Sequence, residues 1–333
     1  MTFWRAVTEN DSGEVDTHMN NTVKKIIRDY GTILALLLII LIFSVLKPTA
    51  FFTPKNFINI TRQMAALTII AIGATMVMVI NEFDLSVGSM ASLGGVMAAL
   101  MAVAGVPVPA AFLLTIAVCV VIGFVNGYIV AKFRVLSFIT TLGMSTVLDG
   151  IIYWLTGGAT VFQNIPKSFT WLGTTKLGEI PLLSILMILF AVLFWFLMRH
   201  TPAGRKMYAI GGNEEASKIA GINVRKYKMI AFSLCAAMAA ITGIVVASRV
   251  GSANTTAGSG YFLQSYAAVF IGCTVSKQGV PNVVGTFIGA AILSILANGL
   301  TILQMPTYMQ DIITGAIIVI AVIAQKLGKG DSK

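Results

Sequence analysis

Long apolar runs recur along this 333-residue chain and constrain its fold more than any other feature. A helix needs about 17–25 mostly apolar residues to cross a bilayer. Nine runs qualify, at residues 31–47, 64–80, 85–104, 108–131, 136–155, 182–198, 229–248, 283–303 and 309–325. A tenth, 261–275, is shorter and contains Gln264 and Ser265. Only 11% of the residues are charged, against about 25% in soluble domains. The sequence therefore predicts an all-α integral membrane protein, a polytopic bundle of about ten transmembrane helices.

The distribution of Lys and Arg decides the number of spans and their orientation, because cytoplasmic segments carry an excess of these residues. With ten spans and an internal N-terminus, 17 of the 23 Lys and Arg residues face the cytoplasm and 6 face outward. Nine spans would place the basic C-terminal residues outside. We therefore expect both termini to be cytoplasmic. The expected parts are a tail at 1–30 without the apolar segment of a cleavable signal peptide, a transmembrane domain at 31–326 and a tail at 327–333.

One cytoplasmic segment, the polar loop at residues 199–228, contains seven of the Lys and Arg residues and shows internal order. Residues 201–204 read as a turn and Gly211-Gly212 as a second break. Asn213 is a predicted N-cap, followed by Glu214 and Glu215 in the first turn, where they complement the helix dipole. Gly221 is the predicted stop of this short helix. A small capped helix held outside the membrane offers another protein a surface to dock on.

Acidic and polar residues interrupt the apolar pattern between the second and third runs, in Asn81, Glu82, Asp84 and Ser86. No Lys or Arg lies nearby in the sequence to pair with the two carboxylates. One interpretation is a short turn in which Asp84 caps the following helix through the N–H of Ser86 or Val87. The other is a broken-helix element that lines or gates a pathway, because ionisable groups in a membrane are costly and often functional.

Three further polar residues, Asn126, Asp149 and Asn298, lie inside predicted spans. Each is either an interhelical hydrogen-bonding group or a ligand of a transported substrate. Glycines four residues apart, as in Gly123 and Gly127, predict close approach of helices in lipid. The three cysteines all fall in apolar runs and are expected to be small buried side chains.

Several functional classes find no support in the sequence. There is no GxxxxGK[ST] phosphate loop, no grouping of His and Cys for a metal and no pattern of catalytic side chains. The net charge of +10 arises from residues at membrane edges and does not indicate nucleic-acid binding. We therefore expect neither an enzyme nor a bound cofactor in this chain.

Four sequence blocks in order resemble the membrane permease subunit of bacterial monosaccharide ABC importers, of the ribose-permease type, over residues 31 to 327. The blocks are residues 84–89 (DLSVGS), 204–213 (GRKMYAIGGN) with 221–224 (GINV), 256–261 (TAGSGY), and 285–290 (GTFIGA) with 298–300 (NGL). Residues 272–281 depart from the glycine-rich stretch typical of that family.

The resemblance implies a function and a set of partners. Two permease subunits, a homodimer or a pair with a paralogous permease, would surround a pathway in the inner membrane and import a monosaccharide such as ribose. Partner ATPases would bind the ATP, and a periplasmic sugar-binding protein would deliver the substrate. The family's coupling loop corresponds to residues 204–224, with candidate positions Gly204, Arg205, Ala209, Gly211, Gly212, Asn213, Glu214, Glu215, Gly221 and Val224. The candidate pathway or gating residues are Asn81, Asp84, Ser86, Asn126, Asp149 and Asn298.

Two other functions remain open from the residues themselves. An ion-gradient-driven secondary transporter could use Glu82, Asp84 and Asp149 as protonation sites, although such a carrier does not require an ordered polar loop. An integral-membrane enzyme acting on a lipid-linked substrate would need a polar catalytic cluster at one face of the membrane.

Overall fold

The computed structural model describes residues 31–275 and 279–330 and is almost entirely helical. Each of the ten predicted runs corresponds to a helix. These are Gly31–Leu46, α3 (Pro54–Val79), α4 (Val87–Val103), α5 (Val108–Phe133), α6 (Ser137–Thr156), α8 (Leu182–His200), α11 (Val224–Val250), α12 (Ser259–Cys273), α13 (Val283–Ile302) and α14 (Thr307–Gly330). Six helices of the described part are long and apolar enough to cross a membrane: α3, α5, α6, α8, α11 and α13. The structure thus supports a helical membrane protein.

Short elements connect these helices. They are α2 (Pro48–Phe51), the 3-10 helix η1 (Lys167–Thr170), α7 (Trp171–Thr174), strands β1 (Lys176–Leu177) and β2 (Ile180–Pro181), α9 (Pro202–Gly212) and α10 (Glu214–Ile219). The strands form an antiparallel hairpin, a small exception to the all-α prediction. The predicted tail at 1–30, the last residues 331–333 and part of the atypical block at 272–281 lie outside the described residues.

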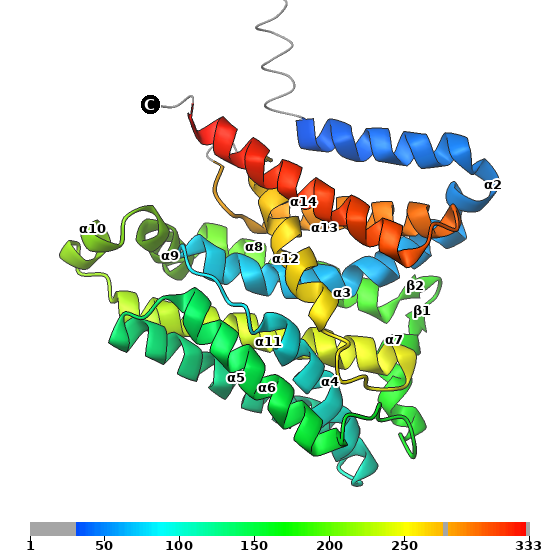
Figure 1. Cartoon of the computed structure of the whole chain (residues 1–333), viewed down its shortest axis with the longest axis horizontal. Helices are drawn as coiled ribbons and strands as arrows, with labels where there is room; N and C mark the ends of the chain where they lie inside the picture. The colour runs from blue at the N-terminus through cyan, green and yellow to red at the C-terminus, as the bar shows by residue number, and fades with distance from the viewer. Residues whose placement is uncertain (1–30, 276–278, 331–333) are drawn as a thin grey trace, which may run out of the picture.

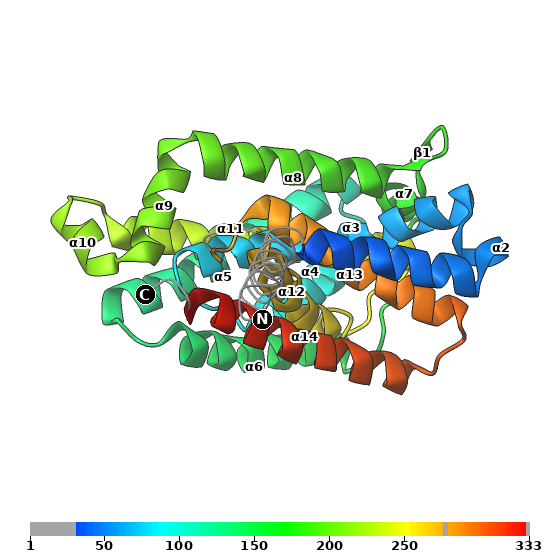
Figure 2. The same ribbon diagram turned by 90° about the horizontal axis from the view of Figure 1, so that it is seen from above.

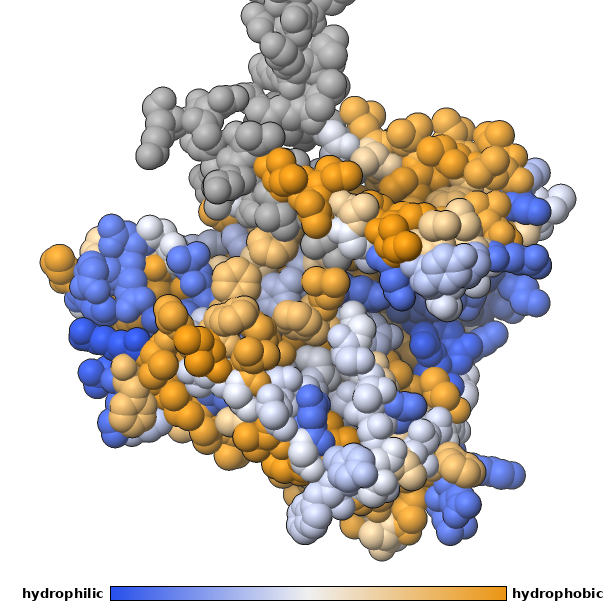
Figure 3. All heavy atoms as spheres, viewed as in Figure 1, coloured by the Kyte–Doolittle hydropathy of each residue, from blue (hydrophilic) through white to orange (hydrophobic). Residues whose placement is uncertain are grey.

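Helices α3, α4, α11 and α13 form the interior, and α5, α6 and α8 keep most of their surface exposed. Figure 1 shows these long helices lying roughly along one common axis, with α9 and α10 projecting at one end and the β1–β2 hairpin at the other. The view from above places α8 and α14 on opposite sides of the interior helices (Figure 2). Hydrophilic residues gather at the two ends, and much of the surface between them is hydrophobic (Figure 3). This arrangement is that of helices crossing a membrane.

Small residues allow the interior helices to approach closely, as predicted. A Cβ atom added at Gly127 of α5 would lie 2.7 Å from the Cα atom of Met229 in α11, and one at Gly123 would collide with the same helix. The three cysteines, Cys119, Cys235 and Cys273, are all buried, as expected. Such backbone contact is how membrane helices associate without a hydrophobic driving force.

Candidate functional site

The first part of the polar loop is the helix α9, which begins where the sequence predicted a turn. Thr201 is its N-cap, and the Thr201 Oγ1 atom accepts a hydrogen bond of 3.3 Å from the Gly204 backbone N–H. Pro202 occupies the first helical position, where its missing N–H costs nothing. The prediction of a turn at 201–204 is therefore wrong, because a Thr-Pro pair also begins a helix.

The glycine pair at the end of α9 is also helical, so the predicted break at Gly211-Gly212 is wrong. Neither glycine has a positive φ angle. Gly211 instead packs on the end of α3, and a Cβ atom there would collide with the Val79 carbonyl oxygen. Gly212 has open space around its Cα atom. Close packing, and not backbone freedom, explains the glycine at position 211.

The short helix α10 has the ends that the sequence predicted. The Asn213 Oδ1 atom accepts a hydrogen bond of 2.9 Å from the Ala216 N–H, and Glu214 and Glu215 occupy the first turn. The chain leaves the helix through Gly221, whose φ angle of 78° favours glycine. Ile219 at the end of α10 is 88% exposed, an unusual position for a large apolar side chain.

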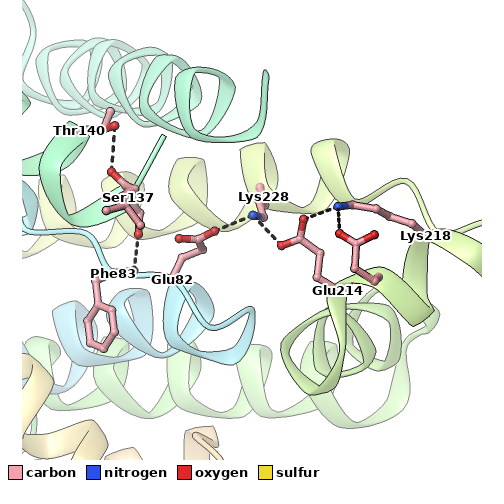
Figure 4. Close-up of polar contacts among 9 residues, drawn as sticks. Glu82, Phe83, Ser137, Thr140, Glu214, Lys218 and Lys228 are labelled. Carbon is pink, nitrogen blue, oxygen red and sulfur yellow. Dashed lines mark hydrogen bonds and ion pairs between the residues drawn. The ribbon is translucent and has the colours of Figure 1, made fainter. Parts of the chain in front are cut away.

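An ion-pair chain, formed by Lys218, Glu214, Lys228 and Glu82, connects α10 to the body of the protein (Figure 4). Lys228, in the first turns of α11, lies 2.9 Å from a Glu214 carboxylate oxygen and 2.6 Å from Glu82 Oε1. Lys218 lies 2.8 Å from Glu214. The Lys228 and Glu82 side chains are only 10% and 16% exposed. The expectation that Glu82 has no cationic partner is therefore wrong.

The ion-pair chain favours the ionised form of Glu214. Partial burial alone would raise the pKa of Glu214, but hydrogen bonds and charge from Lys218 and Lys228 outweigh it and hold the pKa below the ordinary value of 4.5. A carboxylate with a lowered pKa stabilises the folded state fully above its ordinary pKa. That contribution is lost as the pH falls below 4.5 and through the lowered value.

Glu82 belongs to the α3–α4 link, residues 80–86, which continues into a buried polar cluster. The Asp84 carboxylate accepts hydrogen bonds from the backbone N–H of Ser86, at 2.9 Å, and from its hydroxyl. Asn126 of α5 donates to the Ser86 Oγ atom at 3.2 Å. All three side chains are buried. The structure thus shows the predicted hydrogen bond from the Ser86 N–H to Asp84, but the N-cap residue of α4 is Ser86 and not Asp84. It brings Asp84, Ser86 and Asn126 together.

Neighbouring helices fix the backbone of the link. The Tyr266 hydroxyl of α12 accepts a hydrogen bond from the Asp84 N–H at 2.7 Å and donates one to its carbonyl oxygen at 3.0 Å. The Ser137 and Thr141 hydroxyls of α6 accept from the N–H groups of Phe83 and Leu85, and Figure 4 shows the first of these. The link is therefore tied to α6, α11 and α12 at once.

The remaining candidates lie apart from this cluster. Asn298 exchanges two hydrogen bonds, of 3.0 and 3.1 Å, with Asn56 of α3, so it is an interhelical group. Asp149 is exposed on the outer face of α6. Asn81 is exposed with a φ angle of 61°. In the polar loop, Arg205 and Ala209 are exposed and Val224 is buried.

Sequence reasoning missed the partners Lys228 and Tyr266, each far from Glu82 and Asp84 in the chain. The signal in the sequence is Lys228 itself, a lysine directly before the predicted span at 229–248. Within residues 31–275 and 279–330, no group of three His, Cys, Asp or Glu side chains suits a metal ion.

Comparison with known proteins places the chain in a family. The family described as "branched-chain amino acid transport system / permease component" matches residues 56–322. The chain belongs to this permease family. No solved structure matches the permease.

Curated relatives extend over nearly all of the permease. It is 40% identical to the ribose import permease protein RbsC of Escherichia coli strain K12, over 88% of this chain and 92% of the relative. The permease is 38% identical to the RbsC protein of Haemophilus influenzae, over 92% of this chain and 95% of the relative. The xylose transport system permease protein XylH of H. influenzae is 33% identical, with 88% and 94% covered.

Proposed function

We propose that this chain is the transmembrane subunit of an ABC importer and moves a monosaccharide inward across the bacterial inner membrane. The observation that carries the proposal is the match to ribose and xylose permeases over almost the full length of both chains. The relatives are transport components and not enzymes, and the multi-pass helical architecture agrees with their kind of function.

The proposed topology has ten spans with both termini in the cytoplasm. Residues 1–30 and 327–333 would be cytoplasmic tails around a transmembrane domain at 31–326. The distribution of Lys and Arg supports this arrangement. It also places α9 and α10 on the cytoplasmic side and the β1–β2 hairpin outside.

The ATPase subunits are proposed to dock on α10. The exposed Ile219 side chain supplies an apolar anchor on the same helix as the ion pair between Glu215 and Lys218. Apolar anchors with a polar rim are typical of protein–protein contacts. ATP binds to these partners, and no cofactor is proposed for this chain. A second copy of the permease and a periplasmic sugar-binding protein complete the importer.

Coupling is proposed to pass through the ion-pair chain. ATP-driven closure of the partners would displace α10, and Glu214 would transmit that displacement to Lys228 and from there to Glu82. Because Glu82 lies in the α3–α4 link, the displacement reaches α3 and the start of α4 as well as α11. These interior helices could then alternate access to the pathway.

The two alternatives are less well supported. A proton carrier would need a carboxylate free to exchange protons, but Asp84 is buried and hydrogen-bonded to Ser86, and Glu82 is paired with Lys228. A lipid-linked enzyme finds no support in relatives that are transport components.

Reconstitution separates these functions. The permease is placed in proteoliposomes with the ATPase and binding protein of the proposed importer, and uptake of labelled ribose and xylose is measured. We expect uptake only with internal ATP and external binding protein. Uptake by the permease alone, driven by a proton gradient, would replace the proposal with the carrier.

A further inference from the structure

A polar cavity of about 430 Å³ lies at the end of the bundle opposite α9 and α10. Its position follows from the helices that line it. Arg62 lies 17 residues before the end of α3, about 25 Å along the axis from the ion-pair chain. Arg249 is at the other end of α11 from Lys228. On the proposed topology, the cavity belongs to the outward half of the permease.

Among the described residues that line it, the cavity has two positive charges and no carboxylate. The Arg62 Nη2 atom donates to the Gly173 carbonyl oxygen at 3.1 Å. Its Nε atom is buried and, in the described part of the chain, has no hydrogen-bond partner. The ion pairs of residues 31–275 and 279–330 involve neither Arg62 nor Arg249. Arg62 and Arg249 therefore line a polar space without a compensating charge from these residues.

The other lining groups suit a polyhydroxylated molecule. Asn59, Gln63 and Gln264 supply amide donors and acceptors, and Tyr261 supplies an aromatic ring with a hydroxyl. A volume of this size is within the range of small-molecule sites, which combine apolar walls with a few polar groups. Charged side chains within membrane proteins commonly face such cavities and mark substrate pathways.

We propose that this cavity binds the transported sugar and that Arg62 and Arg249 select a monosaccharide bearing a carboxylate, an aldonate or uronate, over its neutral counterpart. The inference rests on the proposed function of sugar import. A carboxylate compensates the two cations and accepts paired hydrogen bonds from a guanidinium group. The amides and Tyr261 then bind the sugar hydroxyls.

Direct binding to the purified permease tests the proposal independently of the binding protein. The full chain in phosphatidylcholine nanodiscs is unfolded thermally with increasing D-ribose, D-ribonate, D-xylose or D-xylonate, because a ligand of the folded state raises the unfolding temperature. We expect each aldonate to bind at least about tenfold more tightly than its aldose. Arg62→Gln and Arg249→Gln should each remove most of that preference.

Control variants separate charge from structure. Arg62→Lys and Arg249→Lys keep the positive charge and should retain part of the preference. Lys55→Gln, an exposed cation at the same end but outside the cavity lining, should leave it unchanged. Unfolding temperatures without ligand report whether each variant folds.

Equal binding of aldose and aldonate, or binding of neither, would overturn the inference. So would acetate or inorganic phosphate raising the unfolding temperature as much as an aldonate does. Loss of the preference in nanodiscs with phosphatidylglycerol would also overturn it. The last would assign the cavity to a lipid phosphate. ATP-driven uptake of a neutral sugar together with equal binding would reject the charge selectivity and leave sugar import intact. Failure of every sugar and sugar acid in the uptake assay would reject the proposed function.

Discussion

At the scale of single residues, the adjacent glycines at the end of α9 differ in what surrounds them. Gly211 faces the Val79 carbonyl oxygen, and Gly212 faces open space. Gly211→Val should therefore separate α9 from α3, at a cost of about 1–3 kcal/mol or more, as for other overpacked sites. Gly212→Val is the matched control and should fold and transport normally. Unfolding temperature and uptake measure both; equal behaviour of the two variants would contradict the role assigned to Gly211.

Asp84 is a buried hydrogen-bond acceptor in the α3–α4 link. It accepts the Ser86 N–H at the start of α4. Asp84→Asn keeps an acceptor oxygen and should retain much of the transport. Asp84→Leu leaves a buried N–H unpaired, which costs about 1–3 kcal/mol, and should lower the folded yield. An Asn variant that folds fully and transports nothing would point to proton transfer instead.

At the scale of elements, α10 is joined to the interior through Lys228. Lys228→Met would leave Glu82, only 16% exposed, without its cation. Breaking buried ion pairs costs about 3–5 kcal/mol, and partial exposure here reduces that to about 2–3 kcal/mol. We expect a lower unfolding temperature and ATP hydrolysis that no longer drives uptake. Lys226→Met, an exposed lysine two residues earlier, is the control. Unchanged coupling in Lys228→Met would remove the ion-pair chain from the mechanism.

Ile219 tests the docking surface of the same element. Because the side chain is 88% exposed, Ile219→Asp should change stability by less than about 0.5 kcal/mol. It should weaken co-purification of the ATPase at least about tenfold, as expected for an apolar anchor. Ile219→Leu should bind normally. Full ATPase binding by the Asp variant would place the contact elsewhere.

The sequence predicted elements better than contacts. Apolar runs located the long helices, but α3 begins at Pro54, ten residues before its run, because Thr53 caps the helix and Pro54 occupies its first position. Capping rules located α10 correctly. The reading of proline and glycine as turn residues failed for α9, because Thr201 and Pro202 begin that helix and Gly211 serves packing against α3. Packing between helices is not encoded locally. The Glu82–Lys228 pair joins residues 146 positions apart, so only the fold could reveal it.

At the scale of the whole molecule, the proposed topology places the two polar ends on opposite sides of the membrane. Lys167 and Lys218 are on η1 and α10, at opposite ends of the bundle. The native cysteines are buried, so an introduced cysteine is the accessible one. In intact cells, a membrane-impermeant thiol reagent should label Lys167→Cys, and should label Lys218→Cys and Lys329→Cys only after permeabilisation. Labelling of Lys329→Cys in intact cells would place the C-terminus outside and remove one span. The span removed would then be α12, because its 15 residues are too few to cross the bilayer unaided.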